Sequence, residues 1–244
     1  TKRKEDNYAT YLIGYCYFHK SDNQTALTYF QNAIEQGCTN ADLFYHIGVI
    51  NFNDAKYDDA MKYYTRAIEI DSNHAFSYND RGSTYRMLGQ MDKAIEDYSK
   101  AAQLNPRMDI FKANLGSAYR LNKNYQKAIE AYDEVLKAHP DNYMVLNNKG
   151  IAQYEMKDYD NAIKTLNECL NKKKDYAYAF NNIGLCYYKK KEYSLAIEAY
   201  TKAIALNPDY GEAYVNRGAA KELSRDMTGA CSDWEKAESL GITN

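Results

Sequence analysis

The sequence contains little of what breaks helices or carries catalytic chemistry. Only three of its 244 residues are proline and only twelve are glycine. It has no GxGxxG, Walker, HExxH or GxSxG motif, so the short signatures of nucleotide-binding loops, metalloproteases and hydrolases are missing. No apolar run approaches the roughly 18 residues that span a membrane. We therefore expect no enzyme, no cofactor, no metal site and no membrane span.

The net charge and the cysteines limit which partners and which cellular compartment we expect for the protein. The formal net charge is −2, so no basic excess exists to neutralise phosphates, which argues against nucleic acid as a partner. An odd number of cysteines without a CxxC favours small buried packing groups over disulfides. Free thiols favour a reducing compartment such as the cytoplasm. A chain that starts without methionine is expected to be an excised piece, which leaves the removal of a signal or anchor open. The cysteines are Cys16, Cys38, Cys169, Cys186 and Cys231.

Glycine recurs with a fixed period of 34 residues. Self-similarity at one period of this length indicates a repeat architecture. The recurring glycines are Gly14, Gly48, Gly82, Gly116, Gly150, Gly184 and Gly218. After a charged lead-in, 1–6, they divide the chain into seven predicted repeats: 7–40, 41–74, 75–108, 109–142, 143–176, 177–210 and 211–244.

Each repeat has the pattern of two short helices. In the third repeat, 75–88 and 91–104 are predicted helices, and Gly89 with Gln90 forms the turn between them. Proline ends a helix because it lacks the N–H that the next hydrogen bond needs. All three prolines (Pro106, Pro140 and Pro208) fall at the joint between repeats. The sequence therefore predicts an all-α fold.

Small and large residues alternate at fixed distances after each glycine. Twelve residues on there is always alanine, and sixteen residues on there is Phe30, Tyr64, Tyr98, Tyr132, Leu166, Tyr200 or Trp234. We expect the glycine to face the alanine so that the paired helices approach closely. The large side chain is expected to fill the groove towards the next repeat.

These positions resemble the tetratricopeptide repeat (TPR) family, and the resemblance covers 7–244. It implies an all-α, right-handed superhelical solenoid of antiparallel helix pairs whose first helices line a concave groove. Arg81, Lys149 and Arg217 depart from the family pattern, since each replaces the apolar residue before a glycine. We expect their stems to cover apolar surface while the charges reach water.

Asparagines are the first candidates for peptide binding. Two residues before the glycine, four successive repeats carry Asn114, Asn148, Asn182 and Asn216. An asparagine amide both donates and accepts, so such a row can hold the backbone of an extended peptide. The resemblance is to TPR domains with asparagine ladders. The alternative is exposed residues copied with the repeat and without a function. Asn147 and Asn181, one residue earlier, are second-tier candidates.

Aromatic and basic side chains are the other candidates. Tyr11, Tyr15 and Phe18 follow Tyr8 on one face of the first predicted helix, and Tyr45 and Phe52 are expected to continue that surface. Either they anchor a partner at an interface, or a helix upstream of this sequence covers them. Arg86 and Arg120 are placed to pair with an acidic ligand or are simply solvated.

Two narrower functions find no support in the sequence. The two-carboxylate clamp of chaperone-binding TPR domains needs a lysine three residues before a glycine, and no repeat has one. The four histidines fall at four different repeat positions. His19 and His46 are expected to approach each other, but two histidines without a carboxylate make a poor metal site.

We expect a non-catalytic protein–protein interaction scaffold that binds an extended peptide or partner segment in its groove. Two alternatives stay open: the substrate-recruiting arm of a larger enzyme, and a spacer or self-assembly module. In the last repeat Trp234 has no following helix to pack on, so we expect a further segment or another copy of the chain to cover it. The segment 229–241 resembles the closing repeat of bacterial TPR proteins.

Overall fold

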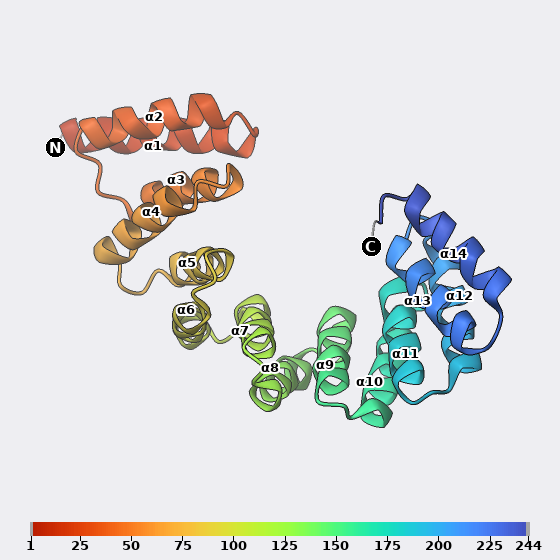
Figure 1. The fold of residues 1–244 in the computed structure, drawn as a ribbon. Helices are drawn as coiled ribbons and strands as arrows, with labels where there is room; N and C mark the ends of the chain where they lie inside the picture. Colours follow the sequence, from red (N-terminus) through yellow and green to blue (C-terminus); the bar gives the residue numbers. More distant parts are fainter. Residues whose placement is uncertain (1, 243–244) are drawn as a thin grey trace. The chain divides into compact units, whose positions relative to one another are not determined.

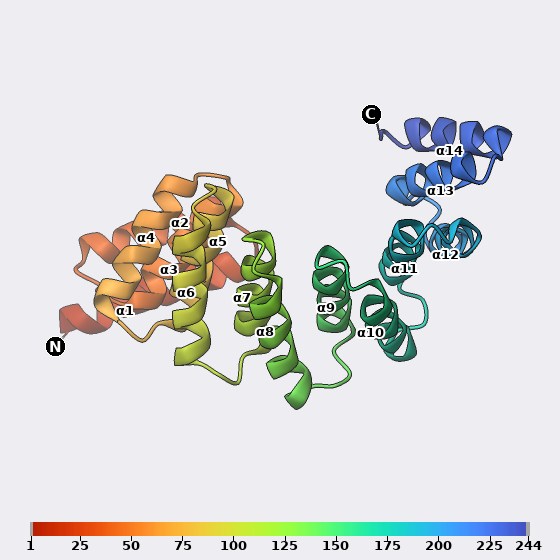
Figure 2. The ribbon, with the colours of Figure 1, turned by 60° about the horizontal axis from the view of Figure 1, so that its bottom comes forward.

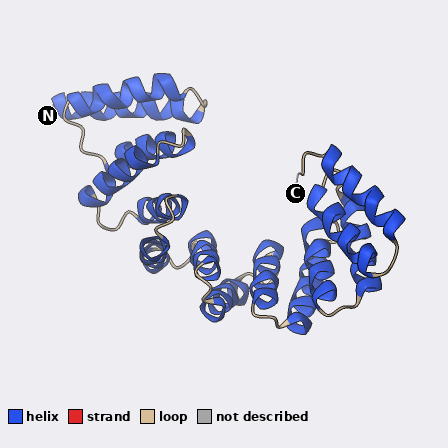
Figure 3. Cartoon of the chain, in the orientation of Figure 1, coloured by secondary structure: helices blue, strands red, loops and turns tan. Residues whose placement is uncertain are grey.

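The computed structural model describes residues 2–242, with side chains described for residues 7–242. In this range all regular structure is helical and no strand occurs (Figure 3). The helices are α1 (Lys2–His19), α2 (Asn23–Glu35), α3 (Ala41–Asn53), α4 (Tyr57–Ile70), α5 (Ala75–Met87), α6 (Met91–Leu104), α7 (Asp109–Leu121), α8 (Tyr125–Ala138), α9 (Tyr143–Glu155), α10 (Tyr159–Lys172), α11 (Ala177–Lys189), α12 (Tyr193–Leu206), α13 (Gly211–Leu223) and α14 (Met227–Ser239). The predicted all-α fold is confirmed.

The chain forms two compact units, Thr1–Asn122 (unit 1) and Lys123–Asn244 (unit 2). Unit 1 contains the pairs α1/α2, α3/α4 and α5/α6, followed by α7 (Figure 1). Unit 2 contains α8, followed by the pairs α9/α10, α11/α12 and α13/α14 (Figure 2). The two helices of predicted repeat 109–142 thus fall in different units. Helix α1 begins at Lys2, inside the predicted lead-in.

The turns within helix pairs share one backbone conformation. Each has a residue with positive φ at the same repeat position: Ser21, Ala55, Gly89, Lys123, Lys157, Lys191 and Arg225. In the turn after α11, the N–H of Lys191 bonds the carbonyl of Tyr188 at 3.0 Å, and the N–H of Glu192 bonds that of Tyr187 at 2.9 Å. These bonds satisfy carbonyls that a helix end leaves unpaired. Gly89 is the only glycine among the seven, so most of these turns hold a side chain in a strained conformation.

Most of the repeated glycines make room for a large side chain, and Gly82 also faces the alanine that we expected there, since a methyl group on it would lie 3.2 Å from the carbonyl oxygen of Ala94. A methyl group on Gly184 would lie 2.5 Å from the ring of Tyr200, and one on Gly150 would lie 2.6 Å from Leu166. Tyr200 also packs against Ala220 of the following pair, so it extends towards the next repeat as predicted. The glycine therefore seats the large residue of its own repeat.

Two of the three basic residues before the glycines, Arg81 and Arg217, pair with buried carboxylates instead of reaching water. Arg81 on α5 binds both oxygens of Asp97 on α6, at 2.7 and 2.9 Å, and donates to Thr65 on α4 at 3.1 Å. Arg217 repeats the arrangement with Asp233, at 2.9 and 2.6 Å. Both carboxylates are buried. Since each guanidinium spans two second helices, the expectation of solvated charges is wrong for Arg81 and Arg217, and these two residues join neighbouring pairs.

The cysteines divide into buried and exposed thiols, all of them free. Cys38, Cys169 and Cys186 are buried, whereas Cys16 and Cys231 are exposed. Burial raises the pKa of Cys169 to about 11 and that of Cys186 to about 12, so both stay protonated as packing groups. The expectation of buried packing groups is therefore wrong for the two exposed thiols. Among residues 2–242, no helix is both long and apolar enough to cross a membrane.

Candidate functional site

A pocket of about 570 Å³ lies on the first helices of unit 1. Helix α1 contributes four side chains, α3 four, and the start of α5 two. Its lining residues, called the histidine pocket from here on, are Tyr11, Tyr15, Phe18, His19, Asp42, Tyr45, His46, Val49, His74 and Phe76. The structure thus brings together the four predicted aromatic anchors Tyr11, Tyr15, Phe18 and Tyr45. Tyr8 packs on Tyr11 instead, and Phe52 packs on Tyr57.

His46 is surrounded by aromatic rings. The rings of Tyr15 and Phe18 each lie 5.0 Å from it, and that of Tyr45 lies 5.3 Å away, all at steep angles to the imidazole. Tyr11 is almost fully buried below, between Phe30 and His46. Steep ring pairs expose faces in several directions, so the pocket is walled by both ring faces and ring edges.

Hydrogen bonds fix the tautomers of two pocket histidines. The N–H of Ser77 donates to His74 Nδ1 at 3.1 Å, so His74 Nε2 carries the proton that it donates to Asp42 Oδ1 at 3.0 Å. His46 Nδ1 contacts the backbone carbonyl of Asp42, which can only accept. Nδ1 of His46 is therefore protonated, and Nε2 of the neutral ring is an acceptor. Burial lowers the pKa of His46, which favours this neutral form.

Sequence reasoning missed part of this pocket. His74 and Phe76 come from a third repeat, and Asp42 precedes His46 by one helical turn. Asp42 and Phe76 occupy the same repeat position, 34 residues apart, but Tyr8 at that position in the first repeat does not line the pocket, so the repeat position alone would not have identified them. The predicted approach of His19 and His46 is confirmed in that both line the pocket.

A chain of hydrogen bonds leads from the pocket to the first predicted asparagine. The hydroxyl of Tyr45 donates to Asp80 Oδ2 at 2.9 Å, and Asn79 Nδ2 donates to Asp80 Oδ1 at 2.7 Å. Asn114 Nδ2 on α7 then donates to Asn79 Oδ1 at 2.9 Å. Burial raises the pKa of Asp80, and the bonds from Asn79 and Tyr45 oppose that rise.

The same asparagine pairing recurs in unit 2. Asn182 Nδ2 donates to Asn147 Oδ1 at 2.9 Å, and Asn216 Nδ2 donates to Asn181 Oδ1 at 3.0 Å. The two acceptors are buried, while the two donors are half-buried. The second-tier candidates Asn147 and Asn181 therefore orient the amides of the next repeat. Asn148 is half-buried and has no such hydrogen bond within the described residues.

These asparagines share a helix face with exposed apolar side chains. Met144 precedes Asn148 by four residues on α9, and Tyr178 precedes Asn182 by four on α11, which places each pair on one face. Both apolar side chains are at least half exposed. Helix α11 contacts α9 and α13, so the faces adjoin (Figure 1). We call Met144, Asn148, Tyr178, Asn182 and Asn216 the asparagine face.

The predicted arginines lie outside the histidine pocket. Arg86 is exposed in the last turn of α5, and Arg120 is partly buried in the last turn of α7. Neither lines the histidine pocket. Their pairing with an acidic ligand stays a prediction.

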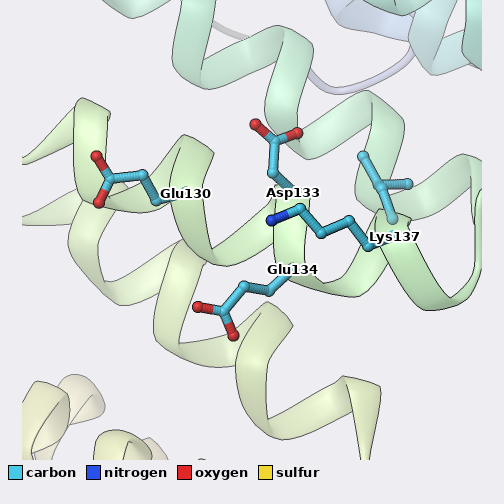
Figure 4. Close-up of a pocket in the computed structure, with 5 residues that line it drawn as sticks. Glu130, Asp133, Glu134 and Lys137 are labelled. Atoms are coloured by element: carbon cyan, nitrogen blue, oxygen red, sulfur yellow. The ribbon is translucent and has the colours of Figure 1, made fainter.

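A shallow acidic depression on α8 does not converge on a site. Figure 4 shows its labelled side chains, Glu130, Asp133, Glu134 and Lys137, all on one helix, with the carboxylates of Asp133 and Glu134 pointing apart. Asp133 is bound by Lys149 at 2.6 Å. Within the described residues, no three histidine, cysteine or acidic side chains form a group that could hold a metal ion.

Profiles of the tetratricopeptide repeat match the chain over most of its length. The matched residues are 8–36, 41–74, 75–108, 109–175 and 177–210. The chain belongs to the tetratricopeptide repeat family. TPR proteins are protein-interaction scaffolds that bind protein or peptide partners, and the TPR fold is generally non-catalytic.

Solved TPR structures resemble the chain in fold at low identity. A TPR protein from Parabacteroides merdae is 21% identical, with a TM-score of 0.81 over 100% of this chain and 95% of that chain. The C-terminal part of a TPR protein from Cytophaga hutchinsonii is 18% identical, with a TM-score of 0.75 and 96% of each chain covered. YrrB, described as a TPR protein with an unusual peptide-binding site, is 21% identical, with a TM-score of 0.61 over 75% of this chain and 95% of that chain. No curated protein sequence matches the chain.

Proposed function

We propose that this TPR protein is a non-catalytic scaffold whose asparagine face holds an extended segment of a partner through its backbone. The observation that carries the proposal is the fixed orientation of Asn182 and Asn216. Each donates one Nδ2 hydrogen to a buried asparagine of the preceding repeat. Within the described residues, Oδ1 and the second Nδ2 hydrogen of each amide have no partner, so both stay available to a ligand.

An amide held in place loses little entropy when it binds, which makes it a good contact for a peptide backbone. Exposed Met144 and Tyr178 offer apolar contact beside the amides, which suits the side chains of an extended segment. The description of YrrB as a peptide-binding TPR protein supports the same type of ligand.

The test begins with linear peptides selected from a random library on the intact chain. Their affinities are then measured by calorimetry for Asn148→Ala, Asn182→Ala and Asn171→Ala. Loss of one backbone hydrogen bond costs about 1–3 kcal/mol, or roughly 5- to 150-fold in affinity. Asn148→Ala is the cleaner variant, because it leaves no asparagine partner unpaired in the described structure. Asn171→Ala is the control, an exposed asparagine on α10.

Equal affinities for all three variants would reject the proposed contact. Thermal unfolding followed by circular dichroism checks that each variant remains folded. Light scattering over a range of concentrations separates peptide binding from self-association through the last pair, where Met227 and Leu223 are about half exposed. A monomer at every concentration would exclude self-association.

A further inference from the structure

The histidine pocket has a ligand chemistry of its own, distinct from that of the asparagine face. We propose that it binds the arginine side chain of a partner peptide, with the guanidinium stacked on the aromatic rings and donating to Asp42 and to His46 Nε2. The proposal goes beyond backbone binding at the asparagine face, because it names a side chain and a different set of residues.

The polar groups of the pocket include hydrogen-bond acceptors without a donor, and only a protonated histidine would bring a positive charge to it. One carboxylate oxygen of Asp42 accepts a hydrogen bond from His74 Nε2, and the Asp42 side chain remains 55% exposed. His46 presents Nε2 as an acceptor, because its Nδ1 proton points to the backbone carbonyl of Asp42. No lysine or arginine lines the pocket. A ligand that brings donors and a positive charge complements this set.

The walls suit a flat cation. The rings of Tyr15, Phe18 and Tyr45 lie 5.0–5.3 Å from the His46 ring at 64–69° to its plane, so three aromatic rings surround the imidazole at steep angles. A guanidinium stacks on aromatic faces while its edge donates to a carboxylate, whereas an ammonium is a compact, strongly hydrated charge. Phe76 at the rim is 43% exposed and offers contact for the arginine stem.

Other occupants match the pocket less well. A purely apolar segment would bury Asp42 against carbon and leave Nε2 of His46 without a donor, which is unfavourable. An acidic side chain would meet the Asp42 carboxylate with no lysine or arginine to offset the repulsion. The volume of about 570 Å³ lies within the range of ligand pockets and exceeds what one side chain needs, so the flanking residues of the peptide have room.

The probes are three alanine pentapeptides whose central residue is arginine, citrulline or lysine. Citrulline keeps the shape and loses the charge. Each peptide is titrated into the intact chain at pH 7.5 and followed by the imidazole proton NMR signals of His46 and His74. We expect the arginine peptide to shift both signals to saturation and to bind at least 10-fold more tightly than the citrulline peptide. The lysine peptide is expected to fall between them.

Variants connect the binding to the named groups. Asp42→Asn is nearly isosteric and should weaken the arginine peptide at least fivefold, while Tyr15→Leu should weaken it severalfold. The control is Asp58→Asn, an exposed carboxylate on α4 in the same unit, which should leave the affinity unchanged. Circular dichroism melting shows whether a weakened variant is merely unfolded.

Three outcomes would overturn the assignment: no shift with the arginine peptide, equal binding of citrulline, or unchanged affinity in both Asp42→Asn and Tyr15→Leu. Tighter binding of lysine would reject the guanidinium. Asn148→Ala should leave the arginine pentapeptide unaffected, so failure here is distinguishable from failure of backbone binding at the asparagine face.

Discussion

The hydroxyl of Tyr45 donates to Asp80 Oδ2 across 2.9 Å, joining the first helices of two successive repeats. Asp80 is a carboxyl whose pKa burial raises, and the bond from Tyr45 is one of two that stabilise its ionised form. The pair therefore connects the histidine pocket, which Tyr45 lines, with the buried amides behind it.

Tyr45→Phe is expected to destabilise the protein by about 1.5–3 kcal/mol at pH 7, the usual worth of a hydrogen bond to a charged group. Folding raises the pKa of Asp80, so the folded state binds more protons and the unfolding free energy falls as pH rises above the ordinary aspartate range. Removing the Tyr45 hydroxyl takes away a bond that lowers the pKa of Asp80, so it strengthens this trend. The destabilisation by Tyr45→Phe should therefore shrink in acid, where Asp80 is protonated. Urea unfolding at several pH values measures it.

The control is Tyr64→Phe. Tyr64 is equally aromatic and more deeply buried, but its hydroxyl has no hydrogen bond to another described residue. We expect it to cost less than about 1 kcal/mol. Equal costs for the two variants would show that the bond to Asp80 does not stabilise the fold.

Two ion pairs whose basic residues, Arg81 and Lys149, share one repeat position should differ in how much they stabilise the fold. Asp97 is buried and binds Arg81 through two bonds, whereas Asp133 is 42% exposed and binds Lys149 through one. Breaking a buried pair leaves an uncompensated charge and costs about 3–5 kcal/mol, while an exposed pair is worth about 0–1 kcal/mol. Asp97→Ala should therefore destabilise far more than Asp133→Ala in urea unfolding.

The double variant Arg81→Met with Asp97→Leu distinguishes the cost of an unpaired charge from the cost of lost packing. Replacing both charges by apolar groups removes the unpaired charge, so most of the lost stability should return. A double variant as unstable as Asp97→Ala would mean that the cost comes from lost packing.

The helical repeat could be predicted because its determinants are local and periodic. Glycine, alanine and the large residue recur at fixed distances, so one interpretation of the packing applies to every repeat. What the spacing did not predict is that the large side chain also packs on the glycine: Tyr200, sixteen residues after Gly184, occupies the space beside it, whereas at Gly82 the expected alanine, Ala94, is a neighbour too. The spacing of residues identifies which face of a helix they share, but the length of each side chain decides which residue contacts the neighbouring helix.

The candidate sites were harder to predict because their contacts join different repeats. Asn147 and Asn182 are 35 residues apart, one more than the period, so neighbouring positions of successive first helices meet. Reading each repeat alone placed both amides on the surface. The histidines look scattered in the sequence, yet α1, α3 and the N-cap of α5 bring His19, His46 and His74 to one pocket.

The turns within helix pairs offer a reciprocal test of backbone strain. Gly89 has φ +73° and a side chain there would meet no atom within 4 Å, so Gly89→Ala should cost about 1 kcal/mol from conformation alone. Lys157 has φ 66° at the same repeat position. Lys157→Gly should therefore stabilise by about 0.5–1 kcal/mol, measured by urea unfolding.

Lys157→Ala is the matched control, since alanine suffers the same strain as lysine at an exposed position. It should change stability by less than about 0.5 kcal/mol. A gain with alanine as large as that with glycine would locate the effect in the lysine charge and not in the backbone.

The last helix pair should lose stability in acid through Asp233. Burial favours the neutral form, but hydrogen bonds from Arg217 and Lys221 outweigh it and hold the pKa of Asp233 below its ordinary value. The folded state therefore binds fewer protons at the Asp233 carboxyl than the unfolded state does. Its contribution is fully present above the ordinary aspartate pKa, near 4, and is lost as pH falls through the lowered value.

Trp234, the only tryptophan of the chain, lies next to Asp233 and donates through Nε1 to the carbonyl of Val215 at 3.4 Å, so its fluorescence reports on α13 and α14. Asp233→Asn should destabilise this pair by about 3–5 kcal/mol at pH 7 and by progressively less towards about pH 2, because the wild-type carboxyl is then neutral too. Asp209→Asn, an exposed carboxylate of the same unit, should leave the curve unchanged. Parallel curves for wild type and Asp233→Asn across this range would mean that the acid sensitivity of the last pair arises from other groups.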